Sequence, residues 1–254
     1  ITAGDDVYVL AEDGSVTMAD GTTTTAGGAA GNNVRIEAGD GDVALSSVVA
    51  DNGNVSIKAS ADITDNTAAP AGYPTTPESA NITAAGLRLE AGGDIGAGDT
   101  PAASDDNVNA INTAVANIEV DAGGSAYIDE ADDITVGGVG DIETDEVRFA
   151  SGTTVDKDDN LTGILAGNNA KLKAGGTITV NEKFEAGTDA LLLATDGDVN
   201  LNAAVEATAG DVSVIARDAD IADGDVVGSV NQNANGDITA GDDVYVLAED
   251  GSVT

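Results

Sequence analysis

The feature that most constrains this chain is an internal copy of its own beginning. Residues 1–17 read ITAGDDVYVLAEDGSVT, and residues 238–254 repeat all of them without a change. Chance identity over that length is negligible, so we interpret residues 1–237 as one module and residues 238–254 as the start of the next identical module. The chain begins at Ile1 rather than Met, which fits a window of a longer tandem array. The alternative is a single unit whose first and last strands happen to match.

A shorter pattern recurs inside the module: apolar-x-apolar-x-Ala, followed by a turn of Gly and Asp. Examples are VRIEA at 34–38, VSIKA at 55–59, LRLEA at 87–91 and AKLKA at 170–174. Its first apolar residues fall at positions 7, 34, 55, 87, 118, 147, 170, 190, 212 and 244, which divides the module into nine short units. Alternation with a period of two predicts half-buried strands, and Gly, Asp and Asn tolerate the turns between them.

Short units of 20 to 32 residues with two or three strands are typical of one coil of a parallel β-helix. We therefore predict an all-β parallel β-helix solenoid of about nine coils per module, rising about 43 Å at a strand spacing of about 4.8 Å. A β-sandwich array is the competing fold, but it needs core aromatics and the chain has four Tyr and two Phe. High charge with few aromatics is also the signature of disorder, against which stands the strict alternation of 41% hydrophobic residues.

Three segments interrupt the pattern and are expected to leave the body as loops. Residues 66–81 hold three of the four prolines, which lack the backbone donor of a strand ladder. Residues 99–118 hold the fourth, and residues 22–33 are small and polar. Within 99–118 the sequence allows a short helix or an irregular loop, because apolar residues at helical spacing follow Asp105 and Asp106. These apolar residues are Val108, Ile111, Val115 and Ile118.

Charge and missing residue types exclude several functions. Lys and Arg total 9 against 46 Asp and Glu, which gives a formal charge of -37 and argues against nucleic acid and anionic membranes as partners. No His or Cys is present, so an imidazole base or metal ligand, a thiol nucleophile, a zinc knuckle and disulfides are excluded. No apolar run approaches the length of a membrane span, so we expect no membrane insertion in this segment.

Paired aspartates are the one conspicuous chemical feature. Asp40 and Asp42 flank Gly41, and Asp196 and Asp198 flank Gly197. Calcium takes six to eight oxygen ligands, often at turns, so these four aspartates are the candidate metal ligands. The simpler explanation is that Asp and Gly are good turn formers, with calcium or other divalent cations held non-specifically by the acidic surface.

No cofactor is required by anything in the sequence. Paired acids are too frequent here to indicate a glycosidase, so we expect no enzyme. The four arginines alternate outward along strands and are expected to pair with neighbouring acids. They are Arg35, Arg88, Arg148 and Arg217.

Several repeat segments carry a family resemblance. GGDI, GDVNLNAAV, GDVSVIA and VRIEAG, placed every two to three strands, resemble the repeat regions of filamentous-haemagglutinin-like adhesins and of giant β-strand-repeat surface proteins of bacteria. The resemblance implies secretion, a right-handed parallel β-helix shaft, and a role in adhesion or cell-surface structure. It carries over no functional residue. The high acidity and the perfect copy depart from such shafts, whose coils have drifted apart.

We therefore expect a structural module of a long, extracellular, acidic β-helical fibre or stalk at the cell surface. Its partners would be identical modules end to end, with lateral association of fibres through cations. The alternative is an adhesin whose loops at 66–81 and 99–118 bind a glycan or another surface. A polysaccharide-active enzyme is the third class considered.

Overall fold

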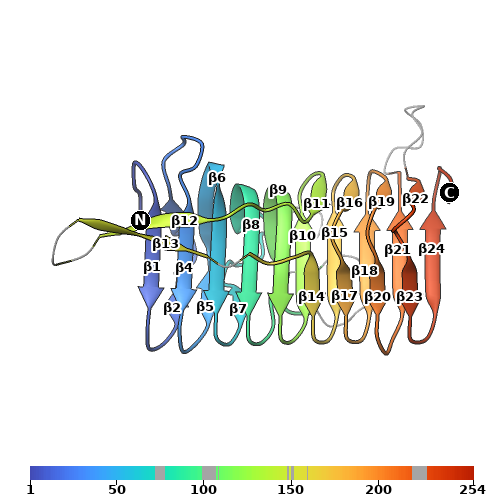
Figure 1. Cartoon of the computed structure of the whole chain (residues 1–254), viewed down its shortest axis with the longest axis horizontal. Helices are drawn as coiled ribbons and strands as arrows, with labels where there is room; N and C mark the ends of the chain where they lie inside the picture. Colours follow the sequence, from blue (N-terminus) through green and yellow to red (C-terminus); the bar gives the residue numbers. More distant parts are fainter. Residues whose placement is uncertain are drawn as a thin grey trace.

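The fold consists of strands stacked side by side along one long axis (Figure 1). The computed structural model describes residues 1–71, 78–98, 107, 109–147, 149, 152–158, 160–218 and 228–254. These residues form no helix, and so none long and apolar enough to cross a membrane. Nineteen strands form one large sheet whose pairings are parallel. This arrangement confirms the all-β prediction and fits a parallel β-helix.

The parallel pairings form three ladders, which the chain visits in a fixed order. The first ladder contains β1 (Val7–Ala11), β4 (Val34–Ala38), the second halves of β6 (Ser47–Ala59), β8 (Ile82–Ala91) and β9 (Ile111–Ala122), then β14 (Ile164–Ala166), β17 (Phe184–Ala186), β20 (Val205–Ala207) and β23 (Ile238–Ala240). The second ladder contains β2 (Val16–Thr17), β5 (Val43–Leu45), β7 (Ile63–Asp65), the bridge residue Ile95, β10 (Ala126–Glu130), β15 (Ala170–Ala174), β18 (Ala190–Ala194), β21 (Val212–Ala216) and β24 (Val244–Ala248).

The third ladder closes each turn of the chain. It contains the bridge residue Thr2, β3 (Thr23–Thr25) and the first halves of β6, β8 and β9. It continues, after a shift along β9 to Asn117 and Ile118, with β11 (Ile134–Val136), β16 (Ile178–Val180), β19 (Val199–Leu201), β22 (Val230–Gln232) and the bridge residue Val253. Because each strand pairs with the strand one turn earlier, equivalent residues lie one above another.

The core is built from such stacks of inward-facing residues. One stack on the first ladder contains Val9, Ile36, Ile57, Leu89, Val120, Ile164, Phe184, Val205 and Ile238. Its inner members are almost completely buried, and each buried side chain of this size contributes about 1.5–3 kcal/mol. Period-two alternation therefore has the meaning predicted from the sequence: one residue in two supplies the core.

The structure corrects the prediction for residues 99–118. Ile111–Ala122 is a strand, not a loop or a helix, because the edge of β8 offers Ile111–Ala122 a long parallel partner. That pairing overrides the local helical spacing of Ile111, Val115 and Ile118. Val108, Asp105 and Asp106 lie outside the described residues.

The structure of the other two predicted loops differs less from the prediction. Within residues 22–33, Thr23–Thr25 is the short strand β3, paired with β6. Within 66–81, the described residues 66–71 and 78–81 lie outside strands and connect β7 to β8, and 72–77 lie outside the described part. The segment remains a loop as far as it is described.

One strand start assigned by the short pattern also differs. Val147 lies in β12 (Glu143–Val147), which pairs in antiparallel fashion with β13 (Thr153–Lys157) and joins neither neighbouring coil. The five-residue strand that stacks between Ile95 and β15 is β10 instead. The pair β12–β13 is called the clasp hairpin below.

Candidate functional site

The predicted metal ligands lie in turns and act as hydrogen-bond acceptors there. Asp40 and Asp42 occupy the turn between β4 and β5, and Asp42 Oδ1 accepts the backbone N–H of Asp62 at 3.1 Å. Asp196 and Asp198 occupy the turn between β18 and β19, and Asp198 Oδ1 accepts the N–H of Ser229 at 2.8 Å. The two turns join different ladders and belong to different coils, so the structure does not bring the two pairs together.

The same acceptor role recurs along the solenoid. The residue just before a strand uses a side-chain oxygen to accept a hydrogen bond from the backbone N–H of the equivalent residue one turn later. The pairs are Asp6 with Asn33, Asn33 with Asn54, Asp62 with Asp94, Asp94 with Ser125, Asp133 with Thr177, Asp189 with Asp211, and Asp211 with Asp243. These bonds pair turn N–H groups that ladder bonds do not reach. The frequency of Asp and Asn before strands therefore has a structural cause.

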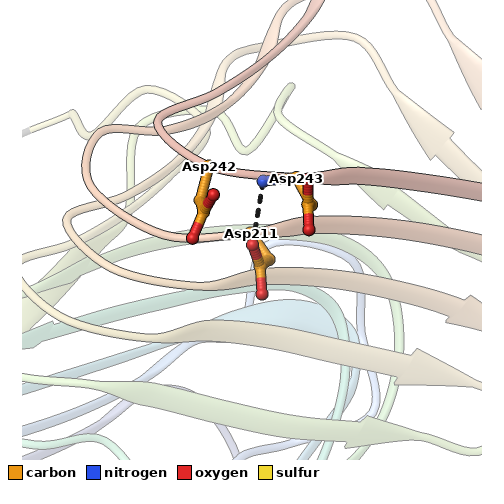
Figure 2. Close-up of side chains that lie close together, drawn as sticks. All are labelled: Asp211, Asp242 and Asp243. Atoms are coloured by element: carbon orange, nitrogen blue, oxygen red, sulfur yellow. Dashed lines mark hydrogen bonds between the residues drawn. The ribbon is translucent and has the colours of Figure 1, made fainter.

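Three aspartates in turns come closest to a metal-binding arrangement. Asp211 precedes β21, and Asp242 and Asp243 precede β24; one carboxylate oxygen from each lies within 4.8 Å of the others (Figure 2). Among the described residues this is the only such acidic cluster. All three are exposed, and Asp211 Oδ1 accepts the N–H of Asp243 at 2.9 Å. With one oxygen from each carboxylate the cluster supplies three of the six to eight oxygens that calcium takes, and it contains none of the four predicted ligands.

Within the described residues, the clasp hairpin is the one pair of strands that lies outside the ladders. It leaves the body between β11 and β14 and runs back over the first ladder, past β1 at the N-terminal end (Figure 1). The N–H of Asp145 donates to Asp6 Oδ2 at 3.3 Å, and Asn33 Nδ2 donates to the carbonyl of Glu143 at 2.8 Å. The hairpin therefore ties the middle of the chain to its first coils.

A buried ion network fixes the base of the hairpin to the body. The Arg88 side chain is 1% exposed, with Nη2 lying 3.1 Å from Glu119 Oε2 and Nη1 lying 3.3 Å from Asp158 Oδ2. Nη2 also donates to the carbonyl of Val139 at 3.2 Å, and Ser56 Oγ donates to Asp158 at 2.6 Å. Side chains from three successive coils thus converge on residues that flank the hairpin.

A second ion pair lies nearer the hairpin's far end. Arg35 Nη1 lies 2.8 Å from Asp156 and Nη2 lies 3.1 Å from Glu37, with the guanidinium 5.4 Å from the centre of the Tyr8 ring. Burial and the negative charges of Glu37 and Asp156 raise the pKa of Tyr8, so this hydroxyl stays protonated.

The expected pairing of arginines with acids holds wherever the structure describes them. Arg35 and Arg88, which are both buried, form the contacts given above, and Arg217 lies 4.0 Å from Glu249 at the surface. Arg148 lies outside the described residues.

Two hollows flank these features. One of about 440 Å³ lies between the hairpin and the first coils, lined by Asp5, Asp6, Asp141, Glu143 and Asp145 among others. The other, of about 420 Å³, lies beside the 66–81 loop and is lined by Thr22, Ser47, Thr67 and Glu78 among others. Both are open; the first is mainly polar, whereas the second has a mixed polar and apolar lining, and both offer hydroxyls and carboxylates to a solvated ligand.

Comparison of the chain with protein-family models, with curated proteins and with solved structures gives no match. The resemblance to filamentous-haemagglutinin-like proteins therefore stays a prediction, as does calcium binding at Asp40, Asp42, Asp196 and Asp198.

A buried acid that the sequence pattern did not reveal lies in the core beside β9. Glu130 is 1% exposed and occupies an inward position of β10. Its carboxylate accepts the hydroxyl of Thr113 at 2.6 Å and the N–H of Val115 at 3.1 Å. A polar residue at an inward position of the alternation Ala126, Ile128, Glu130 was the signal that could have found it.

Acidification from about pH 8 to about pH 5 is expected to raise the melting temperature at low salt. Burial raises the pKa of Glu119, Glu130, Glu78 and Asp121 above the ordinary values of 4.5 for Glu and 3.8 for Asp. The folded chain therefore holds more protons than the unfolded chain between the ordinary and the raised values, and the free energy of unfolding falls as pH rises through that window. Thermal melts followed by circular dichroism measure the change, at about 2–4 °C per kcal/mol.

Two variants separate the buried acids from general charge repulsion. Glu130→Gln removes one buried titrating group and is expected to flatten the pH dependence. Glu12→Gln removes the same charge at an exposed turn and is expected to leave the slope unchanged. A melting temperature that is constant or higher at about pH 8 would contradict the assignment.

Proposed function

We propose that the chain is a structural module of a long, acidic β-helical fibre or stalk, extracellular and attached to a cell surface. In this proposal the module is not an enzyme, and its mechanism is mechanical: continuous backbone ladders carry load, and the number of identical modules sets the length. Carboxylates on the turns keep the shaft soluble and let divalent cations link neighbouring shafts.

The observation that carries the proposal is the way the second copy joins the first. β23 and β24, which belong to residues 238–254, pair in parallel with β20 and β21 through the same register as any two coils of the body. No linker separates the two copies, since Asn233 and Gly236 before β23 already bond to the coil below or to their own turn. A module boundary of this kind transmits force through hydrogen bonds as well as through the chain.

The coil geometry belongs to the same proposal. In the described part of the chain, the first and second ladders each hold nine strand or bridge positions, which supports eight to nine coils per module. We propose that the coils are right-handed, since parallel crossover connections are right-handed in almost all sheets. At about 4.8 Å per coil a module then rises about 40 Å.

The test is the length of engineered arrays. Proteins with one, two and three copies of residues 1–237, each ending in 238–254, are imaged by negative-stain electron microscopy. The expected particles are unbranched rods that lengthen by about 40 Å per copy. Rods whose copies are separated by flexible gaps, or globular particles, would overturn the shaft.

A second candidate function, adhesion, is favoured by the hollow beside the 66–81 loop. Its lining of Thr22, Ser47, Thr67 and Glu78 offers hydroxyls and a carboxylate of the kind that bind sugar hydroxyls. Replacing residues 68–79 by a short Gly-Ser turn distinguishes the two functions. Binding to a glycan array that disappears while the rod keeps its length would favour the adhesin.

A further inference from the structure

The two identical copies do not lie on the same side of the solenoid. β1 belongs to the first ladder and pairs with β4, whereas β24, its copy, belongs to the second ladder and pairs with β21. Val16 pairs with Val43 in the second ladder, whereas its copy Val253 pairs with Val230 in the third. Every strand of the second copy is therefore one ladder further round than in the first.

A single break in the strand pattern causes this offset. From β1 to β9 the five-residue strand segment of each coil lies on the first ladder, followed by shorter strands on the second and third. After β9 ends at Ala122, the linker of residues 123–125 leads directly into another five-residue strand, β10, on the second ladder. In the earlier coils two short strands, on the second and third ladders, separate one five-residue strand from the next, but none separates β9 from β10. The five-residue strands then stay on the second ladder up to β24.

The body absorbs the break by sharing β9 among three strands of the next coil. Ile111–Thr113 pairs with β10, Asn117 and Ile118 pair with β11, and Val120–Ala122 pairs with β14. Between the first two pairings the N–H of Val115 donates to the Glu130 carboxylate instead of to a backbone carbonyl. The backbone N–H of Val115, which the break leaves without a carbonyl partner, thus has a buried acceptor in Glu130.

We propose that successive modules of the array are related by a rise of eight and one-third turns, so that each is rotated by one third of a turn about the shaft relative to its predecessor. We count the two halves of β6, β8 and β9 as separate positions and leave out the clasp hairpin. The path from β1 to β24 then takes 25 steps between successive strand or bridge positions, one more than eight full turns of three steps. The array returns to its starting orientation after three modules, about 120 Å. This inference rests on the proposed tandem shaft and deepens it: the partner is a second copy, and the clasp hairpins point in three directions around the fibre.

Cysteine cross-linking of the 254-residue chain tests the placement of the second copy. The chain has no cysteine, so engineered pairs are the only thiols. Ser213→Cys with Tyr245→Cys joins Cα partners of the observed register, and is expected to form a disulfide on mild oxidation. Leu191→Cys with Ser213→Cys is the matched control of the same geometry within the body.

A third pair tests the alternative placement. A whole number of turns would put the second copy of β1 on the first ladder, where the ladder register brings Leu247 above Glu206. Glu206→Cys with Leu247→Cys is expected to remain reduced, because Glu206 pairs with Thr239 in the observed structure.

Two results would overturn the placement. One is a disulfide between positions 206 and 247, and the other is failure of the 213–245 pair while the 191–213 control forms.

Cryo-electron microscopy of the three-copy array tests the rotation itself. The expected map shows each clasp hairpin one third of a turn from the last. Hairpins aligned along one side of an intact rod would overturn the rotation and leave the shaft standing. Separate particles joined by linkers would overturn the shaft proposal instead.

Discussion

Arg88→Met is expected to lower the free energy of unfolding by about 3–5 kcal/mol and to release the clasp hairpin from the body. Arg88 is 1% exposed and balances both Glu119 and Asp158, which are 3% and 4% exposed at their side chains. Methionine fills much of the same volume but leaves two carboxylates buried without a cation. Breaking a buried ion network by removing one partner is among the costliest single changes.

Urea denaturation followed by circular dichroism measures the loss, and limited trypsin digestion at Lys157 reports on the hairpin. The matched control is Arg217→Met, since Arg217 lies 4.0 Å from Glu249 with both side chains more than a third exposed, and its loss is expected to be about 1 kcal/mol or less. Adding Glu119→Gln and Asp158→Asn to Arg88→Met is expected to recover part of the stability. Equal losses for Arg88→Met and Arg217→Met would contradict the buried network.

Glu130→Ala is expected to lower the free energy of unfolding by about 2–5 kcal/mol, because it leaves two buried hydrogen-bond donors without an acceptor. The hydroxyl of Thr113 and the N–H of Val115 both lose their acceptor, and each unsatisfied buried group costs about 1–3 kcal/mol. Glu130→Gln keeps one acceptor oxygen and is expected to lose less than half as much. The measurement is the midpoint of urea unfolding.

Glu206→Ala serves as the control for this prediction. Glu206 lies on the outer face of β20, paired with the half-exposed Lys183, and its removal is expected to change stability by about 1 kcal/mol or less. If Glu130→Ala were as mild as Glu206→Ala, the break between β9 and β10 would not depend on the Glu130 acceptor.

Local pattern was sufficient to predict many strands of this protein, but not all of them and not the way one coil follows another. Strands such as Val34–Ala38 and Ala170–Ala174 could be predicted because inward and outward residues alternate in any half-buried strand. The break at Gly123 could not, because Ala126–Glu130 carries a glutamate where the pattern has alanine. The pattern at Val147 matched better in sequence, yet that residue belongs to the clasp hairpin.

The candidate site shows the same division. Asp42 and Asp198 lie in turns, as the simpler explanation of their sequence pattern predicts, and their acceptor role follows from their position just before a strand. Metal binding by them stays a prediction. The network of Arg88, Glu119 and Asp158 could not be predicted, because Glu119 and Asp158 are separated from Arg88 by 31 and 70 residues in the chain. The position at which the hairpin folds back onto the body decides which residues it covers, and the local spacing of residues in the sequence does not indicate this position.

The break between β9 and β10 has a consequence for the straightness of the proposed fibre. A solenoid with unequal sides has a preferred direction of curvature. Identical copies stacked in one orientation would all bend the same way, and the whole fibre would curve. Copies that each begin one ladder further round point their curvature in three directions in turn, so that the bends cancel over every three copies. A small irregularity inside the module would then keep a long fibre straight.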